Sequence, residues 1–153
     1  MAVSKARIAG VTLPLFSLRT ERDWGIGEIG DLPACARLLR RHGFSVVQLL
    51  PAHELARGET SPYGARTGFG LDPIYASIEA IADLDAGDIA RTLGEEGVRE
   101  RDALRALPKL DYARVRTLKM KALETAFANF MAREWKNDTP RASHLRAFIT
   151  NEE

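Results

Sequence analysis

Phe44-Ser-Val-Val-Gln-Leu-Leu50, followed after a short spacer by Gly58-Glu-Thr-Ser-Pro-Tyr-Gly64, carries the strongest indication of fold class in this chain. The first segment is apolar on both alternating faces, which is typical of a strand buried on both sides in a parallel sheet. In such folds, the loop that leaves the carboxyl end of a strand is where ligands bind. The sequence therefore predicts a parallel α/β fold with a candidate ligand-binding loop over residues 58–64.

A strand and a helix are predicted upstream of this segment. Residues 8–15 favour a short strand that ends near Pro14, because proline has no N–H for a ladder. Asp31 is expected to cap a helix that runs to about His42, and Gly43 is expected to close it. Strand, helix and strand in this order predict a βαβ unit with parallel strands and a right-handed crossover.

The character of the chain changes after this unit. Residues 71–78 alternate and predict a short strand, but from about Asp85 onward no β-like run is present. Asp111 is expected to cap a long helix that reaches about Trp135 and carries an apolar stripe of 3.6-residue period. A final helix is predicted from Thr139 as cap, with buried apolar side chains on one face: Leu145, Phe148 and Ile149.

The expected fold class is α/β with two or three parallel strands followed only by helices. Such a sheet has an uncovered edge or forms part of an incomplete barrel. A closed (β/α)8 barrel takes about 250 residues, whereas this chain has 153. The sequence therefore predicts an amino-terminal barrel portion over residues 1–84, the first βα units with their loops, and a helical subdomain over residues 85–153.

Composition excludes several classes of partner. Lys and Arg number 22 against 21 Asp and Glu, with no long block of like charge, which argues against a nucleic-acid or membrane arm. No segment approaches the roughly 20 apolar residues of a membrane span. The apolar amino end is interrupted by Thr12 and Pro14 and lacks a cleavage site for secretion. We therefore expect a soluble, cytoplasmic protein with a small or neutral partner.

Metal and thiol chemistry are not predicted. Cys35 is the single cysteine and falls among apolar residues of the first predicted helix, so a buried small hydrophobe is the favoured interpretation over a reactive thiol. His53 has no second histidine or cysteine at metal-ligand spacing and is expected in a loop. No metal or organic cofactor is expected.

Gly25-Ile-Gly-Glu-Ile-Gly30 matches the G-x-G-x-x-G pattern of dinucleotide-binding folds, with Glu54 as a candidate ribose ligand. In those folds the glycines directly follow the first strand, whereas here about nine residues intervene after Leu15. Nucleotide binding is thus a remote alternative. A loop that needs glycine's backbone freedom is the simpler interpretation.

Trp24 and Tyr63 are candidates for stacking on sugar rings, because flat aromatic side chains have few rotatable bonds. Pro62 restricts its own backbone and that of Ser61, so Tyr63 is held in place before a ligand arrives. Two alternatives remain open at this point. For Trp24, the alternative is that the ring packs beneath its own loop. For Tyr63, the alternative is that the ring folds against a neighbouring helix.

Five motifs occur in a defined order: Gly10-Val-Thr-Leu-Pro-Leu-Phe-Ser17, Trp24-Gly-Ile-Gly-Glu-Ile-Gly-Asp31, Val47-Gln-Leu-Leu-Pro51, Thr60-Ser-Pro-Tyr63 and Leu71-Asp-Pro-Ile-Tyr75. Together they resemble the amino-terminal part of 4-α-glucanotransferases, the amylomaltase or disproportionating-enzyme family of glycoside hydrolases. The match covers essentially the first 80 residues. The helical remainder is compatible with the insert that this family carries after its early strands.

The resemblance implies a (β/α)8 barrel that cuts an α-1,4-glucosidic bond and transfers the glucosyl chain to another sugar hydroxyl. In that family the reaction is a retaining double displacement with a carboxylate nucleophile and a second carboxylic acid, and it needs no organic cofactor. Ser61 and Tyr63 match residues that line the family's sugar subsites, and Trp24 is a weaker candidate. The implied partner is a maltooligosaccharide or α-1,4-glucan.

The family's catalytic carboxylates lie on later barrel strands, so the resemblance assigns no catalytic residue to this chain. Some relatives also place an aromatic residue where this chain has Gly58, which puts an outer glucan site in doubt. We therefore expect the chain to be inactive alone and to associate with the missing remainder of the barrel. The alternative is a stand-alone glucan-binding or interaction module that pairs through its open sheet edge.

Overall fold

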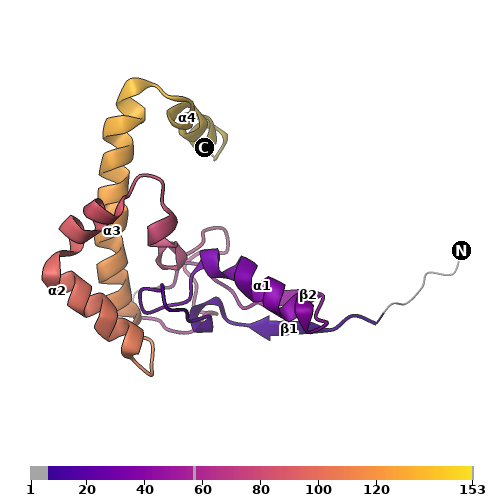
Figure 1. The fold of residues 1–153 in the computed structure, drawn as a ribbon. Helices are drawn as coiled ribbons and strands as arrows, with labels where there is room; N and C mark the ends of the chain where they lie inside the picture. Colours follow the sequence, from indigo (N-terminus) through magenta and orange to yellow (C-terminus); the bar gives the residue numbers. More distant parts are fainter. Residues whose placement is uncertain (1–6, 57, 153) are drawn as a thin grey trace, which may run out of the picture.

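The computed structural model describes residues 7–56 and 58–152 and shows a small parallel sheet joined to a set of helices (Figure 1). Short 3-10 turns lie between the regular elements. In chain order the strands and α-helices are β1 (Gly10–Leu13), α1 (Leu32–Arg41), β2 (Val46–Leu49), α2 (Ala86–Ala106), α3 (Tyr112–Arg133) and α4 (Pro140–Glu152). This mixture confirms the predicted α/β class.

β1 and β2 pair in parallel, as the βαβ pattern predicts, with Gly10 opposite Val46 and Leu13 opposite Leu49. In both strands, exposed and half-buried residues alternate, and Val46 is 44% exposed. The prediction that residues 44–50 form a strand buried on both faces is therefore wrong for the described chain. Among residues 7–56 and 58–152 the sheet consists of these two strands. In that part of the chain, no further strand and no second helical layer covers them.

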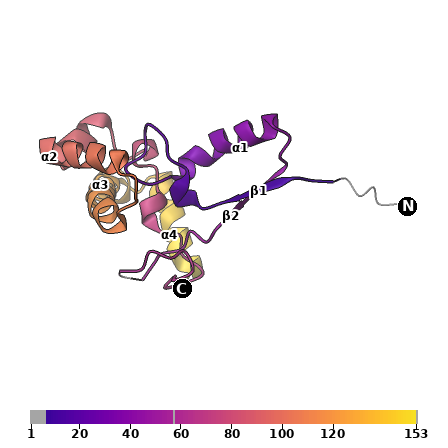
Figure 2. The same ribbon diagram turned by 90° about the horizontal axis from the view of Figure 1, so that it is seen from below.

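α1 begins at Leu32 and ends where Gly43 takes φ of 86°, a conformation suited to glycine. The expected capping role of Asp31 is wrong. Asp31 occupies the N-cap position, but its backbone is helical, with φ of −86° and ψ of −18°, and its side chain makes no cap hydrogen bond; one of its oxygens lies 3.6 Å from the Arg22 guanidinium. None of the α1 residues is buried, and Cys35 is only half-buried. α1 lies apart from α2 and α3 (Figure 2), and its Leu38 side chain is 55% exposed.

The strand predicted over residues 71–78 is absent. That segment forms two 3-10 turns, Pro73–Tyr75 and Ile78–Ala80. Asp72 sets the first turn, because its side chain accepts a hydrogen bond from the Ile74 N–H and Pro73 follows it. The turns bury apolar side chains rather than pairing with the sheet: Ile74, Tyr75 and Ile78.

The helices of the second half begin at side-chain caps. Asp85 and Asp88 form a reciprocal capping box at the start of α2, and Gly94 breaks that helix with φ of 60°. Asp111 caps α3 by accepting from the Arg114 N–H, as the sequence predicts. α3 packs along α2 and buries Val115, Leu118, Ala122 and Ala126. The stripe also contains a fully buried lysine, Lys119, which the periodicity does not predict.

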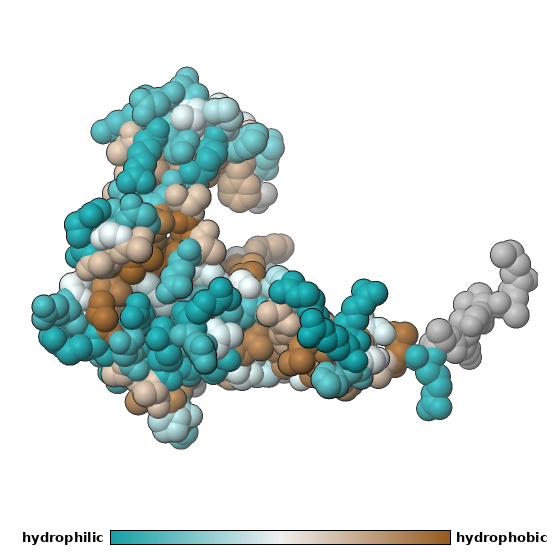
Figure 3. Space-filling model, viewed as in Figure 1, coloured by the Kyte–Doolittle hydropathy of each residue, from teal (hydrophilic) through white to brown (hydrophobic). Residues whose placement is uncertain are grey.

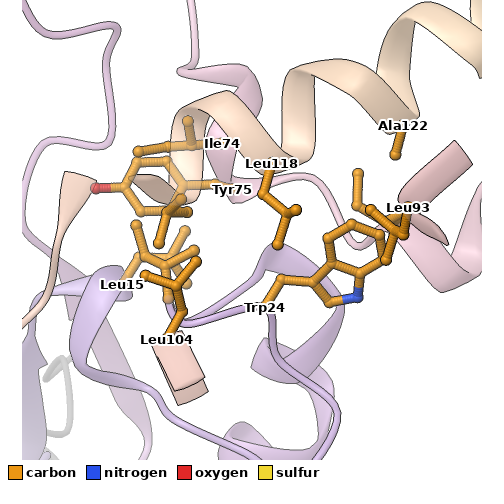
Figure 4. Close-up of a cluster of buried hydrophobic side chains, with 11 residues drawn as sticks. Leu15, Trp24, Ile74, Tyr75, Leu93, Leu104, Leu118 and Ala122 are labelled. Atoms are coloured by element: carbon orange, nitrogen blue, oxygen red, sulfur yellow. The ribbon is translucent and has the colours of Figure 1, made fainter. Parts of the chain in front are cut away.

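One hydrophobic core joins the two halves of the chain (Figure 4). Leu15 and Trp24 come from the amino-terminal half, and Leu93, Leu104 and Leu118 come from α2 and α3. The proposed boundary between residues 84 and 85 thus falls in a turn on the surface of a shared core. The division into two domains stays a prediction.

α4 lies at the far end of α3 and projects sideways from it, on the same side of α3 as the sheet (Figure 1). Thr139 caps it through the Ala142 N–H, as predicted, but Phe148 is 61% exposed and Ile149 is 44% exposed. The prediction that these two residues are buried is therefore wrong, and Leu145 is half-buried. Arg141 holds that start by donating to both carboxylate oxygens of Asp83, at 2.8 and 2.7 Å.

Asp83→Asn is expected to loosen α4 at neutral pH. Hydrogen bonds from Arg141 lower the pKa of Asp83 below its usual value. A carboxyl with a lowered folded-state pKa stabilises the fold above its unfolded pKa of about 3.9, and this contribution is lost as pH falls through the folded value. The protection factor of the α4 amides, which is the intrinsic exchange rate at each pH divided by the observed rate, should fall below about pH 4 in the wild type when measured from pH 7 down to pH 2.5.

In Asp83→Asn that acid-dependent step should be missing, and exchange in α4 should already be fast at pH 7. Asp102→Asn is the control, because Asp102 pairs only with arginines of its own helix. An unchanged pH profile in Asp83→Asn would contradict this role of the ion pair.

Candidate functional site

The loop that leaves the carboxyl end of β2 is folded back on itself. Isolated antiparallel bridges join His53 to Leu71 and Leu55 to Ala65. The Arg66 N–H donates to the Glu54 carbonyl at 2.9 Å, and the Asp72 N–H donates to the Ala52 carbonyl at 3.0 Å. Residues 52–72, which we call the β2 loop, therefore have two stems that are tied together at the base.

Ser61 and Tyr63 lie at the tip of the β2 loop. The Gly64 N–H donates to the Ser61 carbonyl at 2.9 Å, and the Ser61 hydroxyl accepts from the Tyr63 N–H at 3.3 Å. Both residues are exposed, and the Tyr63 side chain is 73% exposed. The alternative in which Tyr63 folds against a neighbouring helix is therefore not what this structure shows. A ring and two hydroxyl-bearing side chains are free to contact a ligand here.

Trp24 does not accompany them. Its side chain is fully buried and lies beside Leu93 and Leu118 in the core (Figure 4). The Asp23 carboxylate causes this orientation, because it accepts from the N–H groups of Thr20 and Gly25 and closes a tight turn. The prediction of Trp24 as an exposed substrate-binding ring is wrong. The alternative in which it packs beneath its loop is correct.

The glycines after Trp24 are explained by packing. Gly25 takes φ of 90°, and a Cβ on Gly27 would lie 2.1 Å from the Leu15 carbonyl oxygen. A side chain at Gly30 would meet the Ser77 hydroxyl at 2.5 Å. These contacts account for the G-x-G-x-x-G spacing without a nucleotide.

A cleft of about 790 Å³ separates the β2 loop from the turn between α2 and α3. Glu54, Glu59 and Thr60 line it on the loop side, and Tyr112 and Arg116 line it on the helix side. Carboxylates, a hydroxyl and a guanidinium on opposing walls suit a neutral ligand with many hydroxyl groups. Ser61 and Tyr63 lie beside this cleft but do not line it.

The sequence did not predict the residues that line the helix side of the cleft. Arg116 donates to both oxygens of the buried Asp72 carboxylate at 3.0 and 2.6 Å. Tyr75 and Tyr112 lie nearby, and burial raises the pKa of each phenol, so both remain protonated at neutral pH. The Asp72-Pro73 pair could have been interpreted as a turn signal, but its partner 44 residues away leaves no trace in local sequence.

A second buried polar cluster holds the segment after β1 against α3. The Lys119 ammonium lies 2.6 Å from a Glu28 oxygen and donates to the carbonyls of Ile74 and Ala76 at 2.7 and 2.8 Å. Burial raises the pKa of Glu28 and lowers the pKa of Lys119, each opposed by the charge of the other. The cluster therefore joins α3 to Glu28 and to the 3-10 turn at residues 73–75.

Two further properties bear on possible ligands. Within residues 7–56 and 58–152, no group of three or more His, Cys, Asp or Glu side chains is arranged to hold a metal ion. In the same part of the chain, every helix is too short or too polar to cross a membrane. Exposed large apolar side chains are distributed over α3, α4, the β1–α1–β2 unit and the β2 loop, and part of this distribution is visible on one face (Figure 3).

Comparison with known proteins gives a consistent result. The family model described as 4-alpha-glucanotransferase matches residues 13–153. The 4-alpha-glucanotransferase of Chlamydia pneumoniae is 32% identical over 111 residues, which cover 72% of this chain and 20% of that protein. The 4-alpha-glucanotransferase of Haemophilus influenzae is 26% identical over 150 residues, which cover 95% of this chain and 22% of that protein.

A third relative, the 4-alpha-glucanotransferase of Chlamydia trachomatis, is 34% identical over 110 residues, which cover 72% of this chain and 20% of that protein. The chain thus spans about a fifth of the length of the curated relatives it matches. Because the family model covers nearly the whole chain, the chain belongs to the 4-alpha-glucanotransferase family.

Proposed function

We propose that this chain is the amino-terminal part of an enzyme that transfers α-1,4-glucan segments between maltooligosaccharides. Family membership supports the activity, and the observation that carries the site is the exposure of Ser61 and Tyr63 on the loop after β2. Those two residues are proposed to contact the glucan, Tyr63 through its ring and hydroxyl. The reaction is a retaining double displacement whose two carboxyl groups come from elsewhere in the enzyme.

We further propose that the β1–α1–β2 unit is the start of a (β/α)8 barrel. The parallel register of the two strands, their alternating exposure and the absence of any buried residue in α1 support this proposal. Further strands and helices would cover these surfaces. The remainder of the barrel is therefore the proposed protein partner, and the cytoplasm is the proposed location.

Tyr63→Ala should weaken binding of maltoheptaose to the 153-residue chain by about threefold to tenfold, because a stacked aromatic ring contributes roughly 0.5–1.5 kcal/mol. NMR titration of backbone amides would measure this affinity. Phe69→Ala is the matched control, because Phe69 is a fully exposed ring on the same loop outside the Ser61–Tyr63 motif. Equal losses in both variants would show that binding depends on exposed aromatic surface in general and not on the motif.

The alternative function is a stand-alone glucan-binding module. It is favoured by the fact that Ser61 and Tyr63 are already exposed at the tip of a loop whose two stems are hydrogen-bonded to each other within this chain. Two assays separate the proposals. Maltotriose disproportionation by the purified chain would contradict the expectation that it is inactive alone. Disproportionation that appears only after the later part of the Haemophilus influenzae relative is added would support the barrel proposal over the module.

A further inference from the structure

The Asp72 carboxylate occupies the base of the β2 loop, where both stems meet. It is fully buried, and its oxygens accept from the N–H groups of Ile74 at 3.1 Å and Leu55 at 3.4 Å. Leu55 belongs to the outgoing stem, and Ile74 belongs to the turn that follows the returning stem. A single carboxylate therefore connects the two ends of the loop.

This carboxylate needs a cation, because an isolated buried charge is costly. Arg116 on α3 supplies it through a bidentate contact, with one guanidinium nitrogen on each oxygen. The fork fixes orientation as well as charge, since a guanidinium and a carboxylate match in plane and spacing. The Arg116 side chain is 34% exposed and lines the cleft on its way to Asp72.

We propose that Arg116 is a positioning residue for glucan binding, acting through Asp72 to hold the β2 loop, and with it Ser61 and Tyr63, at a fixed height against α3. This inference rests on the proposed function of that loop. It assigns to the helical segment a part in substrate binding beyond covering the core. The substrate class concerned is the α-1,4-glucan chain that Ser61 and Tyr63 are proposed to contact.

Two features separate this role from ordinary stabilisation. The other contacts of α3 with the amino-terminal half are the Lys119 cluster, whose partners lie outside the β2 loop, and the apolar core, which meets the loop at Ala52 at its base. Backbone hydrogen bonds hold the two loop stems to each other. The contact between Arg116 and Asp72 connects these stems to α3. Loss of Arg116 should thus free the loop before it unfolds the core.

The test is amide hydrogen exchange on the 153-residue chain. In Arg116→Gln, the amides of Leu55, Ala56 and Arg66 should exchange about tenfold faster or more, whereas those of Val115 and Ala122 in α3 should change far less. Arg141→Gln is the control, because Arg141 makes the same bidentate contact to Asp83 away from the cleft. It should accelerate exchange in α4 and leave the β2 loop unchanged.

Two further variants keep the test decisive if Arg116→Gln folds poorly. Arg116→Lys keeps the charge without the fork and should restore only part of the loop protection. Asp72→Asn should free the same amides as Arg116→Gln, and the double variant should add little, because both changes remove one interaction. Uniform acceleration across loop and α3, or full rescue by lysine, would overturn the positioning role.

Maltoheptaose titration completes the test. Arg116→Gln should lower the affinity by about as much as Tyr63→Ala, roughly threefold to tenfold, with no further loss in the double variant. Loop exchange that responds as expected while the wild type binds no maltoheptaose would refute the proposed glucan site and leave the loop anchor intact. Unchanged affinity in Arg116→Gln with a freed loop would overturn the positioning role alone.

Discussion

Trp24→Ala should destabilise the chain by about 3–5 kcal/mol, the range for truncating a buried large aromatic side chain. Trp24 is fully buried in the hydrophobic cluster that joins the amino-terminal half to α2 and α3. Domains are stable by about 5–15 kcal/mol, so the loss takes up much of the total. Urea unfolding followed by circular dichroism would show the shifted midpoint.

Trp135→Ala provides the matched control for this prediction. Trp135 is half-buried, and its ring stacks under the Arg146 guanidinium at 4.5 Å rather than in the core. Its removal should cost far less. If Trp24→Ala unfolded at the wild-type urea concentration and instead lost maltoheptaose binding, Trp24 would be an exposed sugar platform after all, and the buried orientation would be refuted.

Lys119→Met should cost about 3–5 kcal/mol at neutral pH, because it leaves the buried Glu28 carboxylate without its cation. The carbonyls of Ile74 and Ala76 also lose their donor. Lys121→Met is the control, since Lys121 is exposed on the same helix and its replacement should be nearly neutral. Urea unfolding at pH 7 measures both variants.

The pH dependence identifies the cause of this loss. Burial raises the pKa of Glu28, and removal of Lys119 should raise it further. A carboxyl whose folded-state pKa lies above its unfolded value of about 4.3 costs stability only above that value, where the unfolded state loses its proton. The deficit of Lys119→Met should therefore shrink as pH falls toward 4.

Two results bear directly on this account. In the double variant Glu28→Met/Lys119→Met, stability at pH 7 should recover substantially, because neither buried charge remains. An equal deficit at pH 7 and pH 4 would instead indicate that Lys119 contributes through its packing and its hydrogen bonds to the Ile74 and Ala76 carbonyls, and not through the charge of Glu28.

Local signals predicted much of the framework. Asp111, Thr139 and Pro140 mark helix starts by side-chain and backbone chemistry within a few residues, and the structure places helices there. The parallel pairing of β1 and β2 follows from the strand–helix–strand order, which needs no knowledge of distant residues.

What sequence reasoning missed depends on contacts between distant residues. Lys119 interrupts an apolar stripe and indicates exposure, but its partner Glu28 comes from the loop after β1. Residues 44–50 have the composition of a strand buried on both faces, yet nothing in the described residues covers Val46. The turns at residues 73–80 arise because Asp72 and Pro73 override alternation.

The candidate site divides in the same way. Pro62 predicts a held Tyr63, and the exposed ring agrees with that expectation, while its contact with glucan stays a prediction. The orientation of Trp24 could not be predicted, because flat rings suit both a sugar and a core, and the choice depends on space beside Leu93 and Leu118.

The core shared between the two halves has a consequence for how such a protein can be altered. Side chains from α2 and α3 cover Leu15, Trp24 and Ile74 in this core. A helical segment that only decorated the surface could be deleted, lengthened or exchanged between homologues without harm to the rest. Here excision of α2 and α3 would expose the buried apolar side chains of the amino-terminal half. Insertions, deletions and exchanges in this family should therefore be tolerated at α4 before they are tolerated at α2 and α3.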